Sequence, residues 1–195
     1  MMRIGSILAI PSALALAGCF SFGADPPDSL LRLTAAETVQ PATSRTASAG
    51  EAVTVVVPSV PQELQTLRVP VRTGDTQVAY LKDAQWVEMP GALFGRLLSD
   101  TIAARTGRVV LDPSQFTFDP GVRLTGQLRT FGVDADTGEV VAVYDAAIAR
   151  GEARVETRRF EARLPVAAVD AANVGPALNQ AANQVAVEVA AWIGG

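Results

Sequence analysis

Histidine is absent from this 195-residue chain, and cysteine occurs only once, at Cys19. Because histidine is the usual general base at neutral pH and the commonest metal ligand, its absence disfavours both acid–base catalysis and metal binding. A single thiol also excludes an intramolecular disulfide, so the fold must be stabilised by its hydrophobic core. We therefore expect no catalytic residues, no metal and no cofactor.

Basic residues are not in excess, and no long hydrophobic run is present. Lys and Arg number 16 against 20 Asp and Glu, giving a net charge of −4 without the basic clusters of a nucleic-acid surface. The longest uncharged apolar stretch, residues 4–16, is shorter than the roughly 20 residues of a membrane-spanning helix. With 49% hydrophobic and 18% charged residues, the chain is expected to form one globular domain.

The N-terminus has the order of features found in an export signal. Arg3 precedes the apolar stretch, which ends in Leu-Ala-Gly-Cys at residues 16–19. This ending resembles the lipobox of bacterial lipoproteins, which implies cleavage between Gly18 and Cys19 and attachment of lipid to the Cys19 thiol. The alternative is an ordinary buried thiol. Two or more acyl chains would anchor a protein firmly.

The lipobox interpretation divides the chain into a signal peptide (1–18), a short tether (19–29) and a globular domain (30–195). The mature protein would lie on the periplasmic side of the cell envelope. Phe20, rather than Asp, follows the cysteine, which under the enterobacterial sorting rule favours the outer membrane over the inner membrane.

The N-terminal half of the domain contains short extended segments. Residues 30–37 (LLRLTAAE) are interpreted as a first strand, followed by a polar linker. The β-branched run at residues 53–60 (VTVVVPSV) predicts a buried strand. Two further extended pieces flank the turn TGDT at residues 73–76.

Two amphipathic helices and a C-terminal meander complete the predicted domain. Pro90 and Gly107 bracket a helix over 90–105, in which Phe94, Leu98 and Ile102 share one apolar face. A second helix is predicted over 176–193. Between the helices, three long alternating segments predict antiparallel strands. The predicted fold is α+β, an antiparallel sheet with a C-terminal meander covered by the two helices.

The acidic segment Asp134–Glu139 resembles the start of a calcium-binding loop. It lacks the third acidic position and the distal glutamate of an EF-hand, so a hairpin turn explains it better. Farther along, alternating charges at residues 152, 154, 156 and 158 favour a solvated face with cross-strand partners.

The central part of the sequence resembles the ABC-type transport auxiliary lipoprotein family. The matching features are two arginines, a Tyr-containing strand, and a Trp followed closely by a Pro and a Leu-rich helix. In this chain they are Arg68, Arg72, Tyr80, Trp86 and Pro90.

This resemblance implies a non-catalytic subunit of a lipid-transport system. The implied partners are an ABC permease, its ATPase and a substrate-binding protein of the mammalian-cell-entry (Mce) type. Together these move phospholipid or other hydrophobic molecules across the Gram-negative envelope, and some family members form homo-oligomers.

Several alternatives stay open at the level of sequence. Tyr80 and Trp86 are either core residues or anchors at a partner interface, because Trp, Tyr and Arg dominate interface hot spots. Arg68 and Arg72 are either solvated charges or partner contacts. A stand-alone lipid- or ligand-binding lipoprotein would need an apolar cavity, and a hydrolase would need two converging carboxylates.

Overall fold

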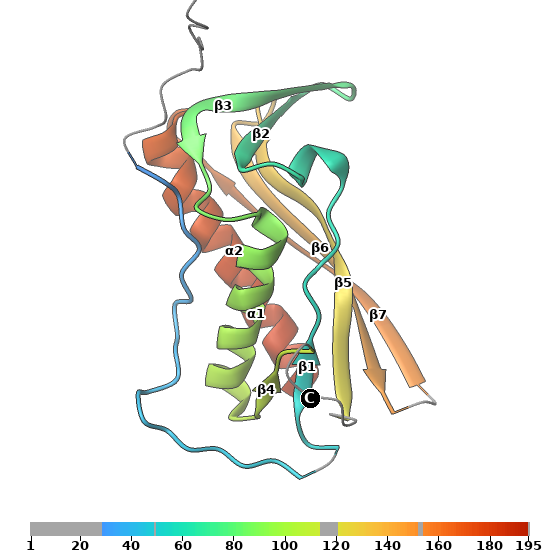
Figure 1. Ribbon diagram of the computed structural model, residues 1–195. Helices are drawn as coiled ribbons and strands as arrows, with labels where there is room; N and C mark the ends of the chain where they lie inside the picture. The colour runs from blue at the N-terminus through green and yellow to red at the C-terminus, as the bar shows by residue number, and fades with distance from the viewer. Residues whose placement is uncertain (1–28, 49, 114–120, 152–153, 195) are drawn as a thin grey trace, which may run out of the picture.

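The computed structural model describes residues 29–48, 50–113, 121–151 and 154–194 (Figure 1). Its elements, in chain order, are β1 (Val53–Val55), the short 3-10 helix η1 (Gln62–Leu64), β2 (Arg68–Thr73), β3 (Gln77–Gln85), α1 (Pro90–Thr106), β4 (Val110–Leu111), β5 (Val122–Asp134), β6 (Glu139–Arg150), β7 (Arg154–Pro165) and α2 (Ala171–Gly194).

The predicted C-terminal meander is confirmed. β5, β6 and β7 pair antiparallel along nearly their whole length, with Leu128 opposite Tyr144 and Tyr144 opposite Phe160. Gly138 adopts a positive φ of 67° in the turn between β5 and β6, a conformation that glycine adopts without steric cost. The segment Asp134–Glu139 is therefore a hairpin turn.

The other edge of β5 is shared by two strands. β1 runs parallel to the start of β5, with Val53 opposite Val122, and β2 runs parallel to its end, with Val71 opposite Val133. β3 pairs antiparallel with β2, and β4 pairs parallel with β1. The α+β fold is confirmed, and the sheet is mixed because these N-terminal strands add parallel pairs to the meander.

α1 has the bounds and the buried face that the sequence predicts. Pro90 is its first residue, and Gly107 ends it in the left-handed conformation at φ 70°. The predicted apolar face is buried almost completely, and it comprises Leu93, Phe94, Leu97, Leu98 and Ile102.

α2 begins five residues before the predicted start at Pro176. The backbone N–H of Asn173 donates to the Asp170 carboxylate at 2.9 Å, and that of Val174 donates to the Asp170 carbonyl oxygen, also at 2.9 Å. Asp170 thus caps the helix, and Pro176 lies inside its early turns. Pro176 is therefore not the first helical position, as predicted from the sequence, because the capping aspartate lies six residues upstream.

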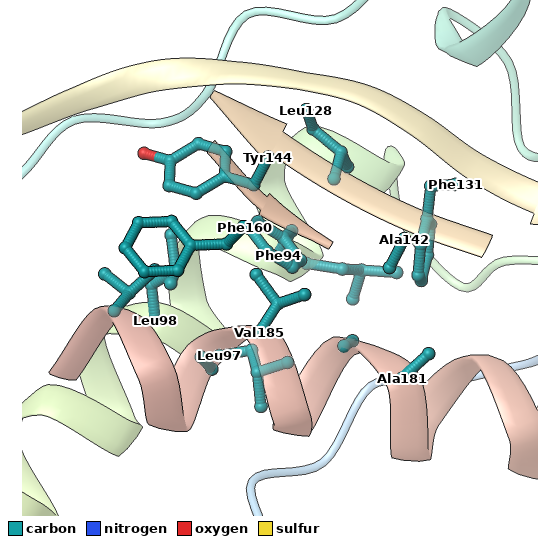
Figure 2. Packing of buried hydrophobic residues seen from close by; sticks show 14 of the residues in the cluster. Phe94, Leu97, Leu98, Leu128, Phe131, Ala142, Tyr144, Phe160, Ala181 and Val185 are labelled. Atoms are coloured by element: carbon teal, nitrogen blue, oxygen red, sulfur yellow. The ribbon is translucent and has the colours of Figure 1, made fainter. Parts of the chain in front are cut away.

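Large aromatic side chains fill the space between the sheet and the helices (Figure 2). The Phe94 ring of α1 lies 5.3 Å from the Tyr144 ring of β6, and Trp86 stacks on Phe131 at 5.2 Å. Trp86, Phe94, Phe131 and Tyr144 are each at most 1% exposed. The core is closed by interlocking side chains from β5, β6, α1 and α2.

The N-terminal segment corrects one prediction. Residues 30–37 do not form a strand; they make a single parallel bridge, Leu31 to Trp86, and then run along α2. Asn179 accepts the Thr34 N–H at 2.8 Å, and Asn183 accepts the Ala36 N–H at 2.8 Å. Asparagine side chains therefore provide the hydrogen bonds that a neighbouring strand would otherwise supply.

The strand predicted at 53–60 is also shorter than expected. Only Val53–Val55 form β1, and Val57 is 60% exposed. Pro58, which has no N–H, interrupts the ladder, although Ser59 still donates to the Gly126 carbonyl oxygen at 3.1 Å. The chain thus follows β5 without forming a continuous strand.

Candidate functional site

The lipobox residues lie outside the part of the chain that the structure describes. Gly18 and Cys19 fall within residues 1–28, so cleavage and lipidation at this position stay predictions from the sequence. None of the helices in the described residues is long and apolar enough to cross a membrane.

Arg68 and Tyr80 lie together on the β2–β3 hairpin. The guanidinium carbon of Arg68 is 4.6 Å from the centroid of the Tyr80 ring, which is a cation–π contact. The Tyr80 hydroxyl donates a long hydrogen bond, 3.4 Å, to the carbonyl oxygen of Glu63. Arg68 is exposed and Tyr80 is half-buried, so both remain accessible at the surface.

Arg72 extends this cluster along the same strand. Its guanidinium forms an ion pair with the Glu63 carboxylate and donates to the Thr130 hydroxyl at 3.1 Å. Glu63 therefore links η1 to both Arg72 and Tyr80. We call Glu63, Arg68, Arg72 and Tyr80 the hairpin face. Glu63 was not predicted from the sequence, because nothing in the local pattern indicates the 3-10 turn that places it there.

Trp86 does not belong to this face. It is 1% exposed, stacks on Phe131 and belongs to the core, so the structure gives it the packing role that the sequence left open. An indole enclosed in the chain's own core offers no contact surface to a partner. Of the four residues considered as partner contacts, Arg68, Arg72 and Tyr80 lie at the surface.

A hollow of about 570 Å³ adjoins the hairpin face. Its lining combines valines of the meander, Val133, Val141 and Val143, with polar and charged side chains. Arg163, one of the lining residues, lies 2.6 Å from Glu161 and within 4 Å of Asp134 and Glu139. Because most of its lining residues are polar or charged, the hollow is not the apolar cavity that an acyl chain would need.

A second hollow, of about 690 Å³, lies between α1 and the chain around Val55 and Val57. Arg45 is one of its lining residues. The Arg45 guanidinium donates to the Ala103 carbonyl oxygen at 2.6 Å, at the C-terminal end of α1. Burial raises the pKa of the Asp100 carboxyl, and nearby Arg96 opposes this shift. Glu88 and Asp112 also line this hollow, and the Glu88 carboxylate forms an ion pair with Arg96.

Two carboxylates of the acidic turn, those of Asp134 and Asp136, accept backbone hydrogen bonds. The Asp134 carboxylate accepts the N–H groups of Asp136 and Thr137, and the Asp136 carboxylate accepts the Gly74 N–H at 2.7 Å. These bonds tie the tip of the β2–β3 hairpin to the meander. Within the described ranges, no three metal-ligating side chains come together.

Charged side chains on the outer face of the meander form a cross-strand pair. Arg159 donates to both carboxylate oxygens of Asp145, at 2.6 and 2.8 Å, which lowers the pKa of Asp145. The sequence predicted a solvated face with cross-strand partners at residues 152, 154, 156 and 158. Arg154 and Arg158 are exposed, which confirms the solvated face, and Glu152 lies outside the described residues. Among the described residues, the Arg154 guanidinium pairs with Glu156 of its own strand at 3.0 Å, and not with a side chain of a neighbouring strand.

Comparison with known proteins assigns this sequence to a family. The sequence pattern of the ABC-type transport auxiliary lipoprotein component family matches residues 32–190. The chain therefore belongs to this family. No curated protein sequence gives a significant match.

Solved structures share the fold at low identity. The crystal structure of protein XCC0632 from Xanthomonas campestris, of the DUF330 family, is 20% identical, with a TM-score of 0.69 over 85% of this chain and 94% of that one. The crystal structure of an uncharacterized protein is 18% identical, with a TM-score of 0.64 over 75% of this chain and 94% of that one.

Proposed function

We propose that this protein is a non-catalytic, lipid-anchored auxiliary component of an ABC transporter of the Mce type. The family match over residues 32–190 carries the proposal, since it names an auxiliary lipoprotein of ABC-type transport. The proposed cargo is phospholipid or another hydrophobic molecule crossing the Gram-negative envelope. The partners would be the permease, its ATPase and the Mce-type substrate-binding protein.

The proposed anchor is Cys19, acylated after cleavage behind Gly18. Its chains would hold the domain at the periplasmic side of the envelope, with Phe20 favouring the outer membrane. The tether of residues 19–29 would then join the lipid to the domain that starts at residue 30.

The hairpin face is the proposed docking surface for the transporter. Arginine and tyrosine are enriched among the residues that contribute most to binding at interfaces. The cation–π contact between Arg68 and Tyr80 orders both side chains before binding, which reduces the entropy lost on docking. Glu63 fixes Arg72 beside them through the ion pair.

Affinity purification of the lipidated, C-terminally tagged chain from its native membrane tests both parts of the proposal. We expect the wild type to recover a permease, an ATPase or an Mce-type protein. Arg68→Ala and Tyr80→Ala should recover less, whereas Arg154→Ala, which removes an exposed arginine from β7, should recover as much as the wild type.

Different results would contradict the proposed function and the proposed docking surface. Failure of the wild type to recover any transporter component would contradict the proposed function. Equal recovery by the hairpin variants and Arg154→Ala would leave the function standing and remove the hairpin face as its docking surface.

The stand-alone lipid-binding alternative requires an apolar cavity between the sheet and the helices. Interlocking aromatic and aliphatic side chains occupy that space (Figure 2). The two hollows described above lie outside this core and are partly lined by charged residues. This packing favours the transporter component over the ligand carrier.

A further inference from the structure

Four large apolar side chains are exposed at the end of the domain where its first described residues lie. Leu30 and Val87 are each 49% exposed, Met89 is 48% exposed and Val169 is 42% exposed. We call these four residues the entry face. Large exposed apolar patches on a domain mark contacts with a partner or a membrane.

Backbone contacts bring the four residues to the same end of the domain. Leu31 bridges to Trp86, and the Val87 N–H donates to the Leu31 carbonyl oxygen at 2.9 Å, so Leu30 and Val87 lie on adjacent segments. Met89 lies two residues farther on, directly before the first residue of α1. Figure 1 shows the first described residues beside the start of α2 and the end of β3.

Val169 lies at the same end of the domain, just before the start of α2. It precedes the capping residue Asp170, and Leu31 packs closely against Gly175 in the early part of the same helix. The opposite end of α2 lies about 36 Å away, because the helix has 24 residues at about 1.5 Å each. There, Arg150 donates to the Ile193 carbonyl oxygen at 3.4 Å, next to the β6–β7 turn.

We infer that the entry face rests on the lipid surface in which the acyl chains of Cys19 are inserted. The inference rests on the proposed lipid anchor. Nine residues lie between Cys19 and Ser29, so the ten residue-to-residue steps from one to the other span at most about 35 Å even when fully extended. This short connection keeps the entry face at a high effective concentration beside the membrane. Each apolar side chain that enters the interface then adds favourable burial.

This orientation also determines which end of the domain points away from the membrane. With the start of α2 at the membrane, the β6–β7 turn and the exposed Val155, which is 68% exposed, would point away from the bilayer. Val155 is thus a matched control: it is an exposed valine, but it lies near the opposite end of α2.

Site-specific fluorescence quenching in vesicles tests the inference. Leu30→Cys, Val87→Cys and Val155→Cys are made in the full lipidated chain, where acylation leaves the new thiol as the only one to label with an environment-sensitive dye. The chains are reconstituted into phosphatidylethanolamine–phosphatidylglycerol vesicles that contain nitroxide-labelled phospholipid.

We expect severalfold stronger quenching at positions 30 and 87 than at position 155. All three substitutions are at exposed positions, and circular dichroism checks that each variant is folded. Equal quenching at the three positions in chains that float with the vesicles would overturn the membrane-facing orientation and leave the lipid anchor standing. Chains that do not float with the vesicles would overturn both.

Discussion

The indole ring of Trp86 stacks on the Phe131 ring at 5.2 Å, with the ring planes inclined by 20°. Trp86 follows directly on β3, and Phe131 lies on β5. The contact therefore packs the end of the β2–β3 hairpin against β5. The indole Nε1 is buried without a hydrogen-bond partner among the described residues. Trp86 therefore contributes through packing area and ring stacking.

Truncating this side chain should be costly. We expect Trp86→Ala to lower the free energy of unfolding by about 3–5 kcal/mol, because it opens a large cavity in the core. Trp86→Phe should cost only about 1–2 kcal/mol, since it keeps an aromatic ring and removes an unpaired donor. Urea unfolding followed by far-UV circular dichroism measures both, and equal losses would contradict the stacking role.

Asn183 should hold the N-terminal segment against α2. Its amide nitrogen donates to the Thr34 carbonyl oxygen at 2.9 Å, and its oxygen accepts the Ala36 N–H at 2.8 Å. Asn183→Ala leaves both backbone groups unpaired, which should cost about 1–3 kcal/mol and speed hydrogen exchange at the Ala36 amide. Asn179→Ala, which loses a more exposed bond to Thr34, should leave the Ala36 amide protected. Unchanged exchange in Asn183→Ala would refute this assignment.

Gly126 should not tolerate a side chain. A Cβ at this position would lie 2.6 Å from the Tyr144 hydroxyl and even closer to the Asp145 carbonyl oxygen. We expect Gly126→Ala to cost about 3 kcal/mol or more, because both neighbours lie in the paired strand β6. Gly138→Ala, at positive φ in open space, should cost about 1–2 kcal/mol. Thermal unfolding measures the loss of stability in both variants. A larger loss in Gly138→Ala than in Gly126→Ala would contradict the close packing around Gly126.

Asp170 should make the stability of α2 depend on pH. The hydrogen bond from the Asn173 backbone N–H lowers the pKa of Asp170 below its ordinary value of 3.8. The stabilising contribution of the carboxylate is therefore complete above that ordinary pKa, and it is lost as the pH falls through the lower folded pKa.

The matched variant for this effect is Asp170→Asn, whose amide can still cap the helix but does not titrate. We expect the stability of the wild type to fall more steeply in acid than that of Asp170→Asn, as measured by urea unfolding at several pH values. Parallel pH profiles for the two proteins would contradict a charged cap.

The elements that could be predicted from the sequence carry a complete local pattern. The helix from Pro90 has a proline at its start, a glycine just after its end and a continuous apolar stripe, so both its bounds and its buried face were predictable. The meander likewise has long alternating segments joined by short turns.

Features that depend on distant contacts could not be predicted. The bridge between Leu31 and Trp86, the short β1 and the division of one edge of β5 between β1 and β2 all depend on pairing partners far along the chain. At the hairpin face, sequence resemblance located the two arginines and Tyr80. It gave no indication of Glu63, because that residue lies in a short turn held in place by its tertiary contacts.

The mass of the N-terminal fragment of the native protein tests the central claim most directly. The proposed lipoprotein should begin at Cys19 and carry covalently bound acyl chains, with residues 1–18 removed. A native chain that begins at Met1, with an unmodified thiol at position 19, would contradict the account.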